Sequence, residues 1–165
     1  MPALEPVHRK IEKLVFARRE ALDAEVLEEL RSLEPLPDET STTWSTPDTW
    51  GRAYLFVALA DIAAQRRLTE AAPLLLERAS YGDPGSMMRD LRHALEGIFD
   101  PDWNSLTELC VRLSSSSRPG TRQWCVEQLG TGADPSSEGP LRSRLADEAP
   151  LVREAAQRAL ARLGR

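Results

Sequence analysis

The 165-residue sequence is poor in the residue types that hold metal ions or disulfide frameworks. It has two cysteines, Cys110 and Cys125, and two histidines, His8 and His93, which lie far apart along the chain. Two cysteines cannot build a disulfide framework or a four-ligand zinc site. Both lie within apolar patterns, which is typical of small buried core residues. We therefore expect no metal site and no cofactor.

Long apolar runs, a secretory signal and a surplus of basic residues are also absent. The longest apolar run, residues 55–60, is far too short to span a membrane. The N-terminal segment lacks the apolar region and the small-residue cleavage site of a secretory signal. Acidic residues outnumber basic ones by 26 to 21, for a formal net charge of -5, whereas nucleic-acid binders carry a basic surplus. The sequence thus predicts a cytoplasmic protein that binds neither membranes nor nucleic acid.

No motif of nucleophilic, metal-dependent or phosphate-binding catalysis is present. The group that most resembles a catalytic cluster is Asp100, Asp102 and Trp103. A structural interpretation explains it better: one aspartate caps the helix that follows, and Trp103 packs at the turn. We therefore predict no catalytic residue and a protein that is not an enzyme.

What the sequence does contain is apolar residues at helical spacing along nearly its whole length, with no convincing strand alternation. This pattern predicts an all-α fold in a single domain over 1–165. Residues 1–34 form an N-terminal helical pair, 35–50 a tryptophan-containing loop rich in Pro, Ser and Thr, and 51–165 a series of repeats. The predicted helices cover residues 6–19, 22–33, 48–66, 69–80, 86–99, 103–114, 121–130, 140–147 and 150–163.

A proline followed closely by an arginine opens several of these helices, and the arginines recur at separations of 37, 33 and 31 residues. Proline pre-sets the first turn of a helix, and stacked helix pairs then share one core. We interpret the arginines as structural groups that bind carbonyls or acids such as Asp61, Asp90 and Asp134. The alternative is an anion-binding ladder. The repeat arginines are Arg52, Arg89, Arg122 and Arg153.

The last helical segment, APLVREAAQRALARLGR at 149–165, resembles the first helix of a HEAT repeat, and residues 118–130 and 83–98 resemble it more loosely. The resemblance extends over residues 47–165. It implies a short right-handed α-α superhelix of about four helix pairs, with the N-terminal pair as a cap. The resemblance also implies a structural role for the recurring arginine, as in HEAT-like repeats.

In stacked repeats one row of helices lines a concave surface, and here the second helix of each pair supplies that row. Apolar side chains and charges of both signs alternate on its outer face, which suits a protein partner. Trp44 and Trp50 either pack back over the core or contact the partner, and Trp50 is expected to be the more buried because it opens a helix. The predicted partner-binding residues are Trp44, Leu74, Glu77, Arg78, Glu108, Val111 and Arg112.

The sequence therefore predicts a non-enzymatic module that binds another protein, with a charge suited to a basic partner. A sharper version is an immunity or antitoxin-type inhibitor of a toxic enzyme, whose acidic charge steers it to a basic nuclease. HEAT-like repeats are also similar in architecture to phycobilin lyases and to alkyl-base DNA glycosylases. No catalytic residue carries over from either, and the net charge disfavours a DNA groove. A weak homodimer through an uncapped end repeat, with surface of the Ala155 and Leu160 type, is a further expectation.

Overall fold

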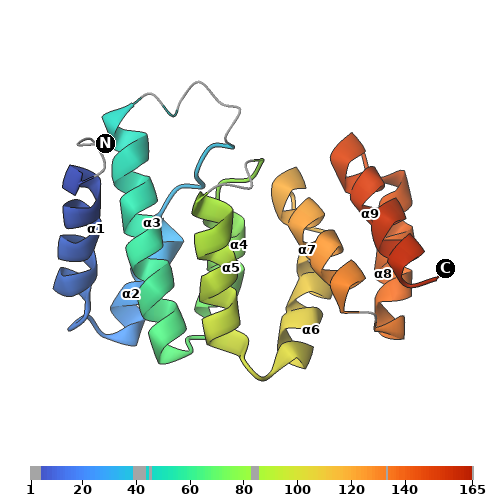
Figure 1. The fold of residues 1–165 in the computed structure, drawn as a ribbon, viewed down its shortest axis with the longest axis horizontal. Helices are drawn as coiled ribbons and strands as arrows, with labels where there is room; N and C mark the ends of the chain where they lie inside the picture. The colour runs from blue at the N-terminus through green and yellow to red at the C-terminus, as the bar shows by residue number, and fades with distance from the viewer. Residues whose placement is uncertain (1–4, 39–43, 45, 83–85, 133, 165) are drawn as a thin grey trace. The chain divides into compact units, whose positions relative to one another are not determined.

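The computed structural model describes residues 5–38, 44, 46–82, 86–132 and 134–164, and these contain helices and no strand. The all-α prediction is thus confirmed for the described residues. Figure 1 labels the helices α1 to α9. The helices are α1 (Glu5–Arg18), α2 (Asp23–Ser32), α3 (Pro47–Arg66), α4 (Ala71–Arg78), α5 (Ser86–Phe99), α6 (Trp103–Leu113), α7 (Pro119–Thr131), α8 (Glu138–Ser143) and α9 (Pro150–Arg162), with the short 3-10 helices η2 (Pro135–Ser137) and η3 (Arg144–Ala146) on either side of α8.

Helix α3 begins at Pro47, one residue before the helix predicted over 48–66. Its first residues therefore lie inside the segment 35–50 that was also assigned to the loop. The backbone N–H of Thr49 donates to the side-chain oxygen of Thr46 at 3.3 Å, and Pro47 occupies the first turn. Both features are favourable at a helix N-terminus, so the helix extends back to the cap.

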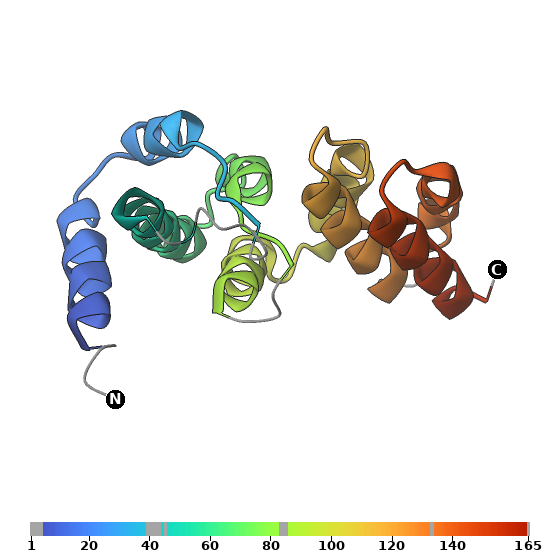
Figure 2. The same cartoon turned by 90° about the horizontal axis from the view of Figure 1, so that it is seen from above.

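The chain divides into two compact units, Met1–Asp100 and Pro101–Arg165, and each has its own internal packing. In unit 1, helix α3 is central: α1 and α5 pack on opposite sides of it, as Figure 2 shows, and α2 and α4 also contact it. Phe56, Leu59 and Ile62 of α3 are almost fully buried and form the middle of this core. The prediction that residues 1–165 form a single domain stays a prediction, because each of the two units is described by itself.

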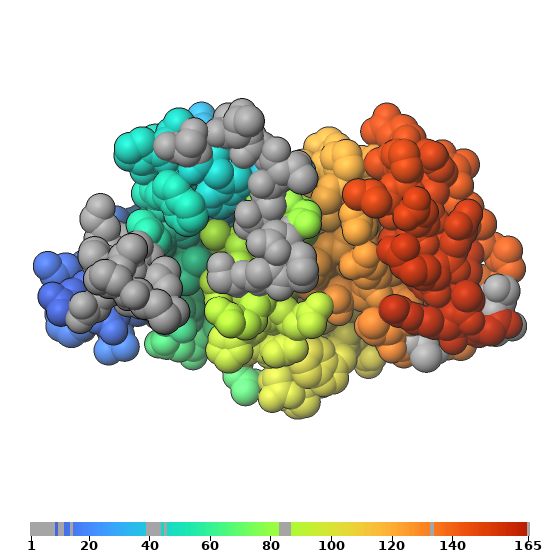
Figure 3. All heavy atoms as spheres, turned by 45° about the horizontal axis from the view of Figure 1, so that its top comes forward, coloured from blue at the N-terminus to red at the C-terminus, as the bar shows by residue number. Residues whose placement is uncertain are grey.

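Unit 2 contains α6 to α9, and its principal contact joins α7 to α9. These two helices lie directly against each other in the space-filling view (Figure 3, orange and red). A Cβ atom added at Gly130 would lie 2.5 Å from the Cβ of Ala159, which is closer than two carbon atoms can approach. Glycine on α7 and alanine on α9 therefore allow the close approach of the two backbones.

The expectation that Ala155 and Leu160 form an open end surface is wrong. They are 1% and 5% exposed, because they lie on the side of α9 that packs within unit 2. The outward side of α9 carries charged residues, among them Glu154 and Arg158, together with Leu151, which is 59% exposed. Because Ala155 and Leu160 are buried, they offer no open surface for a homodimer.

Candidate functional site

Unit 2 buries a charged guanidinium, that of Arg122 on α7. It holds the carboxylate of Asp147 with two hydrogen bonds, from Nε to Oδ2 at 2.9 Å and from Nη2 to Oδ1 at 2.8 Å. The two side chains are 5% and 3% exposed. The hydrogen bond to Asp147 raises the pKa of Arg122 although burial opposes this. Burial alone would raise the pKa of Asp147, but hydrogen bonds from Arg122 and from the N–H of Ala149 bring it below its ordinary value.

Arg122 and Arg153 also bind the chain that precedes their own helices, and they do so in the same way. Nη1 of Arg122 donates to the carbonyls of Ser116 and Ser117, at 2.9 and 3.2 Å. Nη1 of Arg153 donates to the carbonyls that lie six and five positions earlier, those of Asp147 at 2.7 Å and of Glu148 at 3.0 Å. Each arginine thus closes the turn before its helix, which favours the structural interpretation over an anion-binding ladder.

The other two repeat arginines have different surroundings. Arg52 pairs with Glu34 at 3.3 Å and with Asp48 at 3.2 Å. Arg89 is exposed. Burial raises the pKa of Asp90, and the charges of Arg89 and His93 oppose this shift.

The acids that the sequence suggested as partners of the repeat arginines, Asp61 and Asp134, have other contacts. Asp61 accepts a hydrogen bond from Gln65, and Asp134 caps a turn by accepting one from the N–H of Ser136. Gln65 and Ser136 are close neighbours in sequence and lie within reach of a short carboxylate. Arg52 and Arg122 pair with other acids.

The predicted row of second helices includes α4 of unit 1. Leu74, Glu77 and Arg78 are all half-buried there. Helix α2 packs on α4, and Nη2 of Arg78 donates to the carbonyl of Arg31 at the end of α2, at 3.2 Å. This edge of α4 is therefore partly covered by another helix of the same unit.

The second part of the row lies on α6 in unit 2 and is more open. Glu108 and Arg112 are exposed, one turn apart, and Val111 between them is half-buried. Because α4 and α6 belong to different units, a continuous row over both helices stays a prediction.

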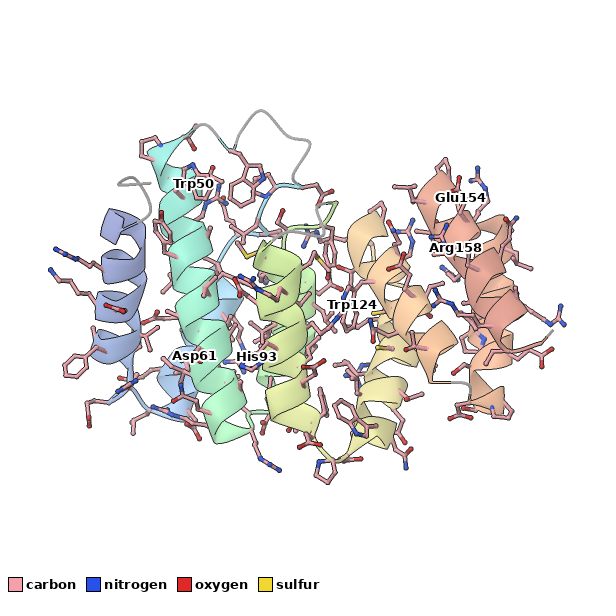
Figure 4. The ribbon with its side chains drawn as sticks, viewed as in Figure 1. Trp50, Asp61, His93, Trp124, Glu154 and Arg158 are labelled. Atoms are coloured by element: carbon pink, nitrogen blue, oxygen red, sulfur yellow. The ribbon has the colours of Figure 1, made fainter. Side chains whose placement is uncertain are left out.

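The two tryptophans of the predicted loop differ in burial, and the order is the reverse of the one expected. The indole N–H of Trp44 donates to the carbonyls of Pro37 and Asp38, both at 3.1 Å, so Trp44 packs back on the chain. Trp50, labelled in Figure 4, is 48% exposed and lies edge-on to Trp44 at a centroid distance of 5.2 Å. The expectation that Trp50 is the more buried is wrong, because Thr49 and not Trp50 faces the core in the first turn of α3.

The group at the start of α6 has the capping role expected from the sequence. Asp102 accepts hydrogen bonds from the N–H and the hydroxyl of Ser105, at 3.3 and 2.6 Å. Trp103 is 46% exposed, and its packing at the turn stays a prediction. Among the described residues, no group of three or more His, Cys, Asp or Glu side chains is placed to hold a metal ion.

Unit 1 contains a feature that sequence analysis missed: a groove of about 1060 Å³ between α1, α2 and α3. Its lining combines small or apolar side chains with five carboxylates. The acids of α2 share one helix face, and this spacing was visible in the sequence. The contribution of α1 and α3 to the groove was not visible in the sequence. The groove is lined by Ala17, Arg18, Ala21, Glu25, Glu28, Glu29, Ser32, Leu33, Glu34, Asp48, Arg52 and Leu55.

Charge in this groove is unevenly paired. Arg18 contacts Glu29 at 3.0 Å, and Arg52 is shared between Glu34 and Asp48. The remaining two lining carboxylates, Glu25 and Glu28, have no ion pair with either lining arginine among the described contacts. Glu25 accepts a hydrogen bond from the N–H of Leu22 as part of the α2 cap, and Glu28 pairs with Arg31 outside the groove.

The helix pairs of unit 2, with an arginine closing the turn before each of α7 and α9, define an α-helical repeat. Comparison with known families is consistent with this class: residues 106–165 match the family of HEAT repeats. The match begins within α6 and extends through α9. HEAT repeats generally mediate protein–protein interactions. No curated protein matches the chain. No described helix is long and apolar enough to cross a membrane.

Proposed function

We propose that this protein is a non-enzymatic module that binds another protein. The observation that carries the proposal is the HEAT-repeat match of residues 106–165, in a unit whose buried charged groups hold the repeats together. Arg122, Asp147 and Arg153 bind protein groups on either side of their turns. The side chains left for a partner are therefore on the outer helix faces.

The open face of α6 is the part of the predicted binding row that best suits a partner. It presents the half-buried Val111 between the exposed, oppositely charged Glu108 and Arg112. Protein interfaces combine an apolar centre with a polar rim in this way. In unit 1, the proposed contacts are Leu74, Glu77 and Arg78 of α4 and the aromatic Trp44.

The formal net charge of -5 favours a basic partner in the cytoplasm, because opposite charges accelerate encounter. An immunity or antitoxin-type inhibitor of a toxic enzyme is one form of such a module. Phycobilin lyases and alkyl-base DNA glycosylases are similar in architecture, but none of their catalytic residues can be assigned to a position of this sequence. We therefore propose binding and no catalysis.

The test is affinity capture from a lysate of the source organism with a charge-swapped α6. In the Glu108→Arg/Arg112→Glu variant the net charge is unchanged, while the charge pattern of the face is reversed. We expect a stoichiometric partner, identified by mass spectrometry, to be captured by the wild type and lost by the variant.

Helix α9 offers a matched control. Glu154 and Arg158, labelled in Figure 4, have the same spacing, are exposed and lie 3.8 Å apart. The Glu154→Arg/Arg158→Glu variant should keep the partner, with both folds checked by circular dichroism. Loss of the partner in both variants, or in neither, would contradict a binding face on α6.

A further inference from the structure

We propose that the acidic groove between α1, α2 and α3 binds an arginine- or lysine-rich segment of the partner protein. This inference rests on the proposed function and assigns a second contact surface, in unit 1, to the same module. The groove combines a large hollow with charge of one predominant sign.

The charge balance of the lining identifies the occupant as cationic. Five carboxylates face two guanidinium groups, and those two are engaged by Glu29, Glu34 and Asp48. Glu25 and Glu28 are exposed on the outer side of α2, less than one turn apart. They can receive incoming cations without the loss of any pair that involves Arg18 or Arg52.

The shape of the lining identifies the occupant as a side chain with an apolar stem. Ala17 on α1 and Ala21, which follows α1, leave space where larger residues would fill the groove, and Leu33 and Leu55 add apolar surface. Arginine and lysine bury their methylene stems on such surface while the charged end stays among polar groups. A small inorganic cation would use only the carboxylates and leave the apolar lining uncovered.

The ion pairs of the groove are accessible to the charges of a macromolecular partner. The pairs of Arg18 and Arg52 are solvent-accessible, with Glu34 80% and Asp48 81% exposed. Such pairs contribute little to folding and exchange readily with other charges. A segment with several cations can therefore also compete for Glu34 and Asp48, which makes the binding sensitive to salt.

The test is fluorescence anisotropy of the full chain with a defined peptide. The probe is a labelled twelve-residue peptide in which arginines alternate with leucine and alanine, and the comparison peptide carries glutamate at every arginine position. We expect the arginine peptide to bind and the glutamate peptide not to bind. The Glu25→Gln/Glu28→Gln variant should weaken binding by about tenfold. Glutamine at position 25 can still serve the α2 cap.

A control variant separates this groove from general attraction to an acidic protein. Glu148→Gln/Glu154→Gln removes the same charge from exposed positions in unit 2 and should leave the affinity unchanged. Equal weakening by both double variants would overturn the proposal.

A substitution that fills the groove tests whether the hollow is the binding site. Ala17 is an exposed residue of the lining, and Ala17→Phe fills the groove without a change in charge. We expect this variant to lose at least as much affinity as the glutamine variant, while Ala161→Phe on the exposed side of α9 should behave as the wild type. Unchanged binding by Ala17→Phe would overturn the groove as the site. Capture that depends on α6 without any peptide binding would leave the proposed function intact and disprove this inference alone.

Discussion

The two units place the same pair of residue types, arginine and carboxylate, in opposite environments. In unit 2, Arg122 and Asp147 are almost completely buried and joined by two hydrogen bonds. In unit 1, Arg52 meets Glu34 and Asp48 at the edge of an open groove, where both acids are about four-fifths exposed. A buried charged pair thus serves the stability of the fold, whereas exposed charges remain accessible to a partner.

Removal of Asp147 should have the largest effect, because it leaves the Arg122 charge buried without its principal partner. We expect Asp147→Ala to lower the free energy of unfolding by roughly 3–5 kcal/mol, measured by urea denaturation. Glu148→Gln is the control, since Glu148 also contacts Arg122 but is 82% exposed, and it should cost less than about 1 kcal/mol. Similar costs for both variants would remove the distinction between the two environments.

The next largest effect is expected at the contact between α7 and α9. Gly130→Ala places a methyl group against Ala159 and should destabilise the protein by roughly 1–3 kcal/mol, because the two helices must move apart. Gly132, at the end of the same helix, has no atom within 4 Å of an added Cβ. Gly132→Ala should therefore leave the melting temperature unchanged or raise it slightly. A tolerated Gly130→Ala would contradict the close packing.

The pH dependence of stability offers a smaller and more specific comparison. The folded-state pKa of Asp147 is lowered, so its stabilisation is complete above the ordinary aspartate pKa and is lost as the pH falls through the lowered value. The pKa of Asp90 is raised, so its ionisation costs stability as the pH rises from the ordinary value through the raised one. We expect Asp147→Asn to flatten the acid limb of the stability curve and Asp90→Asn to increase stability at neutral pH. Unchanged curves would contradict both assignments.

The smallest effect is expected in unit 1. Glu34→Gln removes one exposed acid from Arg52, which keeps Asp48 as a partner. The free energy of unfolding should change by less than about 1 kcal/mol in thermal or urea denaturation. A loss as large as that of Asp147→Ala would show that exposure does not separate the two kinds of pair.

Much of the fold could be predicted from the sequence, because its signals are local. The starts of α7 and α9 follow from Pro119 and Pro150, and Asp102 was identified as a candidate cap before α6. The error at Trp50 arose because periodicity identifies a helix but not which residue of its first turn meets the core. Thr49 occupies that place.

The candidate groove could not be predicted, because its lining comes from three helices that only tertiary packing brings together. Acids on one face of α2 are visible in the sequence, but such a face is usually just solvated. Ala17 of α1 and Ala21, which follows α1, line the same groove as those acids, and that relation is absent from any local pattern. The same holds for Asp147: its proximity to Arg122 spans two helix pairs, and the sequence suggested other acids.

The carbonyl contacts of Arg122 and Arg153 fix the length of the chain in two places. Each guanidinium must reach carbonyls six and five positions earlier, so the spans 116–122 and 147–153 have no freedom to gain or lose a residue. An insertion there would move the arginine away from its carbonyls and, in the first span, shift the register of α7 against α9. These turns are therefore unsuitable sites for a tag, a loop graft or a circular permutation, and natural length variation in this chain is expected elsewhere.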